Sequence, residues 1–288
     1  MKWTVLKLTN RAATILSEKG SETPRLDAEL LMCHLLKWEN RVKIYTEHNR
    51  PISPKEVENY RQLIIRRAKG EPVAYITGKK EFFGFSFKVT KNVLIPRPET
   101  ELLVEKTVSL IKKSNRQHPL KIADVGTGSG CIIITIGKLS QRPAKLFATD
   151  ISEKALTIAR ENAKIHNIDI SFIKTDLLTD LEENFSLIVS NPPYIPFKDE
   201  RVDLNVTKYE PKTALYGGKK GTEIIEKLIK QSFKRLVEDG YLLIEIGDGQ
   251  AQQVKETFNS TGFKNIETIK DLSRKERIVI GVKKCTSS

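Results

Sequence analysis

Residues 122–132 read Ile-Ala-Asp-Val-Gly-Thr-Gly-Ser-Gly-Cys-Ile, an apolar stretch that runs into three alternate glycines. Because glycine has no Cβ, the backbone amides of such a loop can approach a ligand that side chains would otherwise keep away. In an open α/β sheet this loop lies at the carboxyl ends of the strands, where ligands bind. The stretch therefore predicts a buried strand, a ligand-binding turn and a helix that begins at Cys131.

Apolar runs and helical patterns alternate on both sides of this loop. We expect strands at residues 120–124, 145–150, 170–174, 186–190, 241–246, 263–269 and 277–282, and helices at 131–139, 153–167 and 223–236. Strands that alternate with helices indicate a mainly parallel sheet covered on both faces. The fold class predicted for this part of the chain is therefore α/β.

The first quarter of the chain has a different sequence pattern. Apolar residues recur at helical spacing after the start of the chain, after Thr23-Pro24 and after Ser53-Pro54, which predicts three helices in a small bundle. Residues 75–89 are aromatic and alternating, which favours a β-hairpin. We expect a helical domain at 1–75, a hairpin linker at 76–97 and a sheet domain at 98–288.

Composition excludes several classes of protein. The 288 residues are 39% hydrophobic and 30% charged, and no apolar run approaches the roughly 20 residues of a membrane helix. Three scattered cysteines form no disulfide framework, which favours a reducing compartment such as the cytoplasm. No histidine stands at a metal-ligand spacing, so we expect no metal site. These residues are Cys33, Cys131 and Cys285, and His34, His48, His118 and His166.

The net charge of +13 is uneven along the chain. Sixteen Lys and Arg against nine Asp and Glu give residues 1–80 a net of +7. Such a balance favours an anionic partner, for example RNA or the ribosome. It is equally typical of a lysine-rich surface that keeps a protein in solution. Charge alone leaves both interpretations open.

The glycine loop fits neither common nucleotide-binding template. A dinucleotide fold requires G-x-G-x-x-G and a phosphate loop requires G-x-x-x-x-G-K-[ST], whereas this loop is G-x-G-x-G with no lysine after it. The next predicted strand ends in Asp150, which is placed to accept both hydroxyls of a ribose. Asp176 follows the third strand and precedes Leu177. This pattern suits S-adenosylmethionine, which has a ribose and an adenine but no pyrophosphate.

A second motif, Asn191-Pro-Pro-Tyr194, comes directly after the apolar run at 185–190. The prolines Pro192 and Pro193 fix φ and remove two backbone donors, so nearby carbonyls stay free to accept. The amide oxygen of Asn191 and the carbonyl of Pro192 can hold the two hydrogens of a planar amino group, with the Tyr194 ring beside it.

An amide or exocyclic aromatic nitrogen is a poor nucleophile because its lone pair is delocalised. Acceptors on both of its hydrogens favour a tetrahedral nitrogen whose lone pair faces a methyl sulfonium. No general base is evident, and none is needed before positive charge develops on the nitrogen. Together with the glycine loop, the motif predicts an amino-group methyltransferase.

At these residues the sequence resembles the HemK/PrmC family of protein-(glutamine) methyltransferases. The resemblance covers nearly the whole chain. It rests on the glycine loop, on Asn191–Tyr194 and on the strings at 23–31, 71–78, 94–101, 209–215 and 276–279. It implies a Rossmann-like class I methyltransferase sheet with a small N-terminal helical bundle and a β-hairpin linker. It also implies that the chain methylates the side-chain amide of the glutamine in the Gly-Gly-Gln motif of peptide chain release factors.

The resemblance also implies site residues and partners. Asn191, Pro192, Pro193 and Tyr194 would hold the glutamine, and S-adenosylmethionine would contact Gly126, Thr127, Gly128, Ser129, Gly130, Asp150, Leu177 and Asn191, with Asp176 next to it. Leu177 would pack on adenine as an aliphatic side chain where some relatives carry tryptophan. Arg97, Glu99, Glu101 and Glu210 are expected to be structural. We expect a cytoplasmic monomer with release factors as partners, weak contact with RNA or the ribosome and no membrane.

Two alternatives stay open at this point. An N-methyltransferase for adenine in DNA or RNA would use the same turn on a flipped base. A non-enzymatic RNA-binding protein with a methyltransferase fold would not need the acceptors of Asn191–Tyr194.

Overall fold

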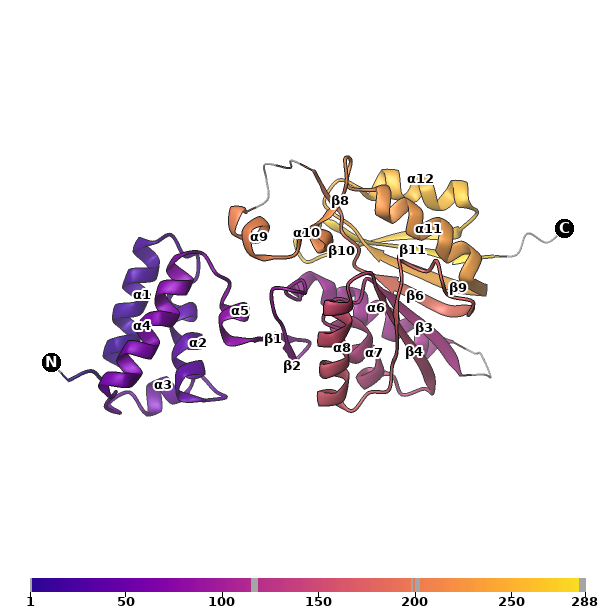
Figure 1. Ribbon diagram of the computed structural model, residues 1–288. Helices are drawn as coiled ribbons and strands as arrows, with labels where there is room; N and C mark the ends of the chain where they lie inside the picture. The colour runs from indigo at the N-terminus through magenta and orange to yellow at the C-terminus, as the bar shows by residue number, and fades with distance from the viewer. Residues whose placement is uncertain (1, 115–118, 198, 200–202, 285–288) are drawn as a thin grey trace. The chain divides into compact units, whose positions relative to one another are not determined.

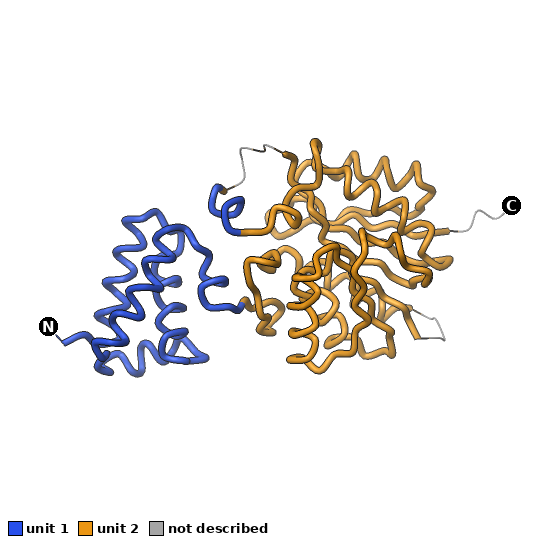
Figure 2. The backbone as a smooth tube through the Cα atoms, viewed as in Figure 1, with its two compact units in different colours: residues 1–79, 204–209 blue, residues 80–203, 210–288 orange. Residues whose placement is uncertain are grey.

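The computed structural model describes residues 2–114, 119–197, 199 and 203–284. The chain divides into two compact units (Figure 2). The helical unit comprises Met1–Lys79 together with Leu204–Tyr209, and the sheet unit comprises Lys80–Asp203 and Glu210–Ser288. The return of Leu204–Tyr209 to the helical unit is a feature that the sequence pattern does not predict.

The helical unit contains the three predicted helices and three short ones. These are α1 (Val5–Glu18), α2 (Pro24–Leu36), α3 (Lys43–Thr46), α4 (Pro54–Ala68), α5 (Val73–Thr77) and α9 (Leu204–Tyr209). A reciprocal capping box of Ser53 and Glu56 starts α4, as the Ser-Pro sequence predicts. The faces of the longer helices enclose one apolar cluster, in which the Tyr60 hydroxyl donates to the Ala28 carbonyl at 2.7 Å.

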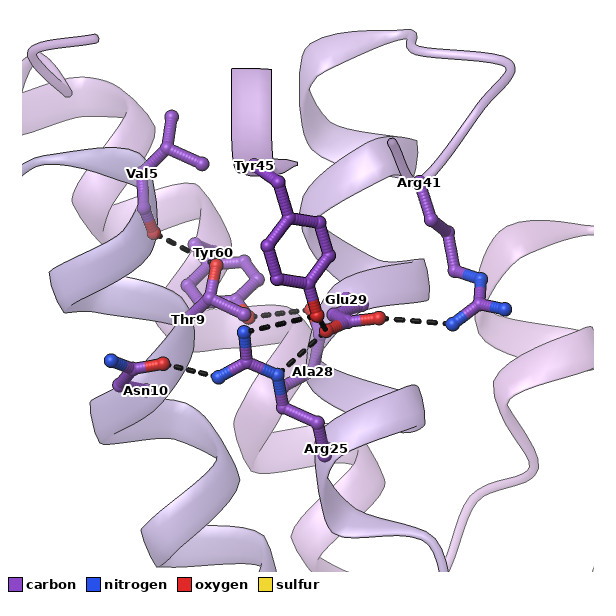
Figure 3. A network of polar contacts seen from close by, with 9 residues as sticks. All are labelled: Val5, Thr9, Asn10, Arg25, Ala28, Glu29, Arg41, Tyr45 and Tyr60. Atoms are coloured by element: carbon purple, nitrogen blue, oxygen red, sulfur yellow. Dashed lines mark hydrogen bonds and ion pairs between the residues drawn. The ribbon is translucent and has the colours of Figure 1, made fainter. Parts of the chain in front are cut away.

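A buried carboxylate ties the segments of the helical unit together (Figure 3). Glu29 on α2 is 2% exposed and accepts from Arg25 Nε at 2.6 Å, from Arg41 Nη1 at 3.0 Å and from the Tyr45 hydroxyl at 2.6 Å. Arg25 also donates to Asn10 of α1. A buried charge is tolerated when it is paired and hydrogen-bonded in this way. The network therefore joins α1, α2 and α3 around one anion.

The sheet unit is built on seven strands in the order β10-β11-β9-β6-β3-β4-β5. Four strand pairs are parallel, namely β4–β5, β3–β4, β3–β6 and β6–β9. Strand β11 is antiparallel to both of its neighbours. This arrangement confirms the predicted mainly parallel α/β sheet. The strands are β3 (Leu120–Val125), β4 (Ala144–Asp150), β5 (Ser171–Lys174), β6 (Phe185–Ser190), β9 (Leu236–Glu245), β10 (Lys264–Lys270) and β11 (Glu276–Lys283).

Helices cover both faces of this sheet (Figure 1). Ile122 of β3 belongs to a core with α6, α7 and α8, whereas the next residue, Ala123, belongs to a core with α11 and α12. Successive strand residues face opposite sides, so both faces of β3 are apolar. The helices are α6 (Glu101–Lys113), α7 (Cys131–Leu139), α8 (Glu153–His166), α11 (Glu223–Arg235) and α12 (Ala251–Thr261). In the part of the chain that is described, no helix is long and apolar enough to cross a membrane.

The predicted hairpin is present as β1 (Lys79–Phe82) and β2 (Phe85–Lys88). The side chain of Asn162 on α8 holds it: its Oδ1 accepts from Lys88 N at 2.7 Å and its Nδ2 donates to Lys88 O at 3.0 Å. The same Nδ2 donates to Ser129 O in the glycine loop at 2.8 Å. Glu101 accepts from Phe83 N at 2.7 Å, in agreement with its expected structural role.

The strand order reverses at β3, with β4 on one side and β6 on the other. Such a switch point opens a crevice at the carboxyl ends of the strands. Short elements complete the region beyond β6, namely β7 (Ile195–Pro196), β8 (Tyr216–Gly218), α10 (Lys212–Leu215) and the 3-10 turn η1 (Pro98–Thr100) ahead of α6.

Candidate active site

The glycine loop follows β3 and leaves room for a ligand. Gly126 N and Thr127 N both donate to Thr149 O at 2.9 Å, which fixes the loop against β4. Gly126 and Gly128 have φ of +71° and +55°, and a Cβ added at either would meet no atom within 4 Å. Both positions therefore need glycine for their backbone conformation and face open space.

Gly130 has a different role in the same loop. A Cβ there would lie 3.0 Å from Ile134 Cδ1 and 3.2 Å from Ala159 Cβ. Its φ is +80°, and its missing side chain lets α7 pack closely on α8. Gly130 is thus required by packing between two helices.

Two carboxylates lie beneath the loop. Asp150 accepts from Gly128 N at 3.0 Å and from Ser152 N at 2.9 Å, while burial raises the pKa of its carboxyl group. Asp124 is fully buried and accepts from Thr127 Oγ1 at 2.6 Å. Burial raises the pKa of Asp124 to about 7, and its Oδ1 has no hydrogen-bond partner. The carboxyl groups of Asp124 and Asp150 therefore hold the loop and can still accept further hydrogen bonds.

A cavity of about 910 Å³ opens beside this loop, within the sheet unit. Its volume lies in the range of pockets that hold a small organic ligand or cofactor. Of the residues expected to form the site, it is lined by Gly126, Thr127, Gly128, Ser129, Asp150, Asp176, Leu177, Asn191 and Pro193. The described residues that line it do not include Gly130, Pro192 or Tyr194.

The residues that follow β4 and β5 line part of the cavity, and they include two aliphatic side chains. Leu177 lines it with a left-handed backbone, φ +59°, a conformation that favours glycine. The segment is held by α11, where Gln231 accepts from Leu178 N at 2.9 Å and Lys227 pairs with Asp176. Ile151 also lines this part and is 60% exposed. An exposed isoleucine inside a cavity is suited to packing on a flat apolar ring.

The Asn-Pro-Pro-Tyr turn forms another wall and is fastened at both ends. Ser190 Oγ donates to Val125 O at 2.6 Å before the turn, and Gln250 Nε2 donates to Tyr194 O at 2.9 Å after it. Asn191 Nδ2 donates to Thr100 Oγ1 at 3.0 Å. Because the amide nitrogen is engaged in this way, the oxygen of Asn191 is the atom left to accept from a ligand in the cavity.

Some residues that line the cavity are not predicted from the sequence. Thr100 and Arg97 come from the segment ahead of α6, and Phe197 and Tyr216 come from the β7 and β8 region. Phe197 is 55% exposed, and its ring centroid lies 5.6 Å from that of Tyr216. The only signal in the sequence for the aromatic pair is the position of Phe197 three residues after the turn.

Arg97, which lines the cavity, forms an ion pair with Glu210. Arg97 Nη2 lies 2.5 Å from Glu210 Oε1, and Glu210 Oε2 accepts from Ile95 N at 3.1 Å. Within the described ranges, no group of three His, Cys, Asp or Glu side chains is arranged to hold a metal ion. Cys33 and Cys131 are free buried thiols, and Cys285 and His118 lie outside the described residues.

Comparison with known families and proteins shows which family this chain belongs to. The PrmC N-terminal domain matches residues 7–78, and the methyltransferase small domain matches residues 100–208. A release factor glutamine methyltransferase from Rhodopirellula baltica is 39% identical over 288 residues, which cover 96% of this chain and 95% of that protein. One from Geobacter sulfurreducens is 37% identical over 282 residues, covering 97% and 96%.

Solved structures agree on the fold. A methyltransferase from Pyrococcus furiosus has a TM-score of 0.54 at 20% identity and covers 79% of this chain and all of that one. The catalytic domain of hMettl16, solved with an RNA hairpin, has a TM-score of 0.55 at 16% identity, covering 84% and 87%. Family models match residues in both units, and the relatives align with nearly the whole chain. The chain belongs to the release factor glutamine methyltransferase family.

Proposed function

We propose that this chain transfers a methyl group from S-adenosylmethionine to the side-chain amide nitrogen of the glutamine in the Gly-Gly-Gln motif of peptide chain release factors. One observation carries the proposal. The open glycine loop and the carboxamide of Asn191 line the same cavity. A methyl donor and an amide acceptor bound there would be neighbours, as the transfer requires.

The residues present fit the cofactor. The acceptor sites that remain on Asp150 suit the ribose hydroxyls, and Gly126 and Gly128 leave open space for the methionine part. Leu177 and Ile151 offer aliphatic surfaces to adenine. When bound, S-adenosylmethionine supplies an electrophilic methyl group on a sulfonium.

The chain's own groups prepare the glutamine. The Asn191 oxygen accepts one hydrogen of the substrate amide. The carbonyl of Pro192 remains the candidate acceptor for the other, although Pro192 is outside the described lining of the cavity. Both acceptors withdraw the nitrogen lone pair from conjugation and stabilise the positive charge that develops during transfer. The prolines keep this part of the backbone free of competing donors. The proton is lost after the charge has formed, so the site needs no strong base.

Substitution of Asn191 tests the proposal. We expect Asn191→Ala to lower kcat by about 10²–10³-fold, the scale observed when one charge-stabilising group is removed, with little change in cofactor affinity. Asn259→Ala, on the exposed face of α12, is the control. The assay is incubation with labelled S-adenosylmethionine and a release factor, followed by mass mapping. Label on adenine of a nucleic acid and none on the glutamine would instead support the adenine methyltransferase alternative.

We also propose that residues 1–75 dock the release factor, with 76–97 as the linker to the methyltransferase domain at 98–288. The basic balance of residues 1–80 supports a docking surface for an acidic partner. Removal of residues 1–75 should raise KM for the release factor and leave cofactor affinity intact. An unchanged KM would contradict the docking role.

The remaining parts of the proposal are weak contact with RNA or the ribosome, a monomeric state and a cytoplasmic location. The net charge of +13 supports the first of these. RNA binding should then fall steeply between 50 and 200 mM salt, and light scattering should give a mass near 32.7 kDa.

A further inference from the structure

A glutamine that does not line the cavity holds the end of the Asn-Pro-Pro-Tyr turn. Gln250 stands at the start of α12, is half-buried and is outside the described lining of the cavity. Its Oε1 accepts from Gly247 N at 2.9 Å, and its Nε2 donates to Tyr194 O at 2.9 Å. A backbone N–H can only donate and a backbone carbonyl can only accept, so these two partners fix the orientation of the carboxamide. Gln250 therefore ties the turn to the connection between β9 and α12.

Three glycines approach the same turn so closely that a side chain would not fit without a shift. A Cβ on Gly217 of β8 would lie 2.5 Å from Pro193 O, and one on Gly221, ahead of α11, would collide with Tyr194 O. A Cβ on Gly247, ahead of α12, would lie 3.1 Å from Cδ2 of the Tyr194 ring. Gly217 and Gly247 are not among the described glycines with positive φ, so space rather than backbone conformation requires glycine there. Backbone from three other segments therefore packs against the end of the turn.

These contacts bear on Asn191 because the turn itself is stiff. Pro192 and Pro193 have a fixed φ, which leaves fewer backbone rotations that could absorb a displacement at Tyr194. The other end of the turn is anchored as well, since Ser190 Oγ donates to a carbonyl at the end of β3 at 2.6 Å. A shift of the Tyr194 carbonyl would therefore be passed on to the Asn191 side chain.

We infer that Gln250 and Gly217 are positioning residues for methyl transfer. Gln250 fixes the Tyr194 carbonyl by a hydrogen bond, and Gly217 lets β8 approach the Pro193 carbonyl. Together they determine where the Asn191 oxygen stands in the cavity, and a shift of about 1 Å in such a group lowers a rate by about 10²-fold. Neither residue belongs to the described lining of the cavity, so binding of cofactor and substrate should not depend on them directly. This inference rests on the proposed function of Asn191.

The test uses the full-length enzyme with a release factor and S-adenosylmethionine. Gln250→Met removes both hydrogen bonds at similar side-chain length and should lower kcat about 10–100-fold, with cofactor Kd and substrate KM within about twofold. Gln250→Glu keeps an acceptor for Gly247 N but turns a second oxygen toward Tyr194 O, so its kcat should fall at least as far. The same two substitutions at Gln252 are the matched controls, because this side chain is exposed and donates to Glu256 of its own helix, α12.

Gly217→Ala tests the close approach of β8 by itself. The added Cβ must displace Pro193 O or the backbone of Gly221, so kcat should fall at least about 10-fold while cofactor Kd stays within about twofold. Gly240→Ala is the matched control: Gly240 is buried without a positive φ, and a Cβ there would lie 2.8 Å from Val237 O, beside the start of β6 rather than its end. Both variants should lower Tm, because both add a methyl group against backbone, but only Gly217→Ala should lower kcat.

Several outcomes would overturn the inference. They are wild-type kcat in Gln250→Met, wild-type kcat in Gln250→Glu, an equal loss in the Gln252 variants, and a loss in Gly240→Ala as large as that in Gly217→Ala. If Gly217→Ala does not fold, the Gln250 variants decide alone. Full activity of Asn191→Ala would refute the proposed function itself. An inactive Asn191→Ala beside a fully active Gln250→Met would refute only the positioning role.

Discussion

Replacement of Gly128 by alanine isolates the contribution of the glycine loop to cofactor binding. Gly128 has φ +55°, so any other L-residue there costs roughly 1–2 kcal/mol of stability. A Cβ at this position meets no protein atom within 4 Å, so we expect the variant to fold. For a domain of this size the strain corresponds to a fall in Tm of about 2–8 °C.

The added methyl group stands in the cavity that Gly128 lines. Forcing one extra methyl group into a fitted contact costs about 1–3 kcal/mol, which corresponds to a rise in Kd for S-adenosylmethionine of about 5–150-fold. Gly128→Val should abolish binding, because its branched side chain enters further.

Isothermal titration with S-adenosylmethionine, together with thermal melts, measures both effects in Gly128→Ala. Gly249→Ala is the matched control, since Gly249 has φ +81° and equally open surroundings but lies outside the described lining of the cavity. The control should show a similar fall in Tm and wild-type Kd. Wild-type affinity in Gly128→Ala, or an equal loss in the control, would refute the assigned role of the loop.

Two further predictions concern the packing role of Gly130 and the buried charge of Glu29. Gly130→Ala should destabilise the protein by about 2–4 kcal/mol, because strain at φ +80° adds to contacts of 3.0 and 3.2 Å with Ile134 and Ala159, and Kd should change less than in Gly128→Ala. A Tm above that of Gly128→Ala would contradict this. Glu29→Gln should destabilise the helical unit by only about 1–2 kcal/mol, because Arg25 and Arg41 are 41% and 51% exposed. Burial raises the pKa of Glu29, but hydrogen bonds from its partners outweigh burial and lower it below 4.5. This stabilisation is therefore complete above about pH 4.5 and lost at more acidic pH. Both tryptophans, Trp3 and Trp38, lie in the helical unit, so their fluorescence in urea at pH 6 and pH 3 measures it selectively.

The parts of the fold that could be predicted are those encoded by neighbouring residues. The glycine loop and α7 follow from residues 122–139 alone, because a strand, a turn and a helix are each local patterns. The capped start of α4 is equally local. The helix α12 escapes prediction because its buried residues are few and stand among polar ones. The four-residue α3 is too short to show a period.

The candidate site divides in the same way. Asp150 is predictable because an acid at the end of a strand stands next to the loop in any sheet of this topology. The contact of Thr100 with Asn191 joins residues 91 positions apart and depends on how η1 meets β6. The packing role of Gly130 depends on Ala159 of another helix. Such contacts are properties of the tertiary structure, which single-sequence patterns do not encode.

Asn162 joins the hairpin to the glycine loop. One carboxamide binds both backbone groups of Lys88, at the end of the hairpin, and the carbonyl of Ser129 in the glycine loop. The chain reaches this point nine residues after it leaves the helical unit at Lys79. A single side chain therefore ties the end of the hairpin to the backbone of the glycine loop, and removal of its carboxamide would release both attachments.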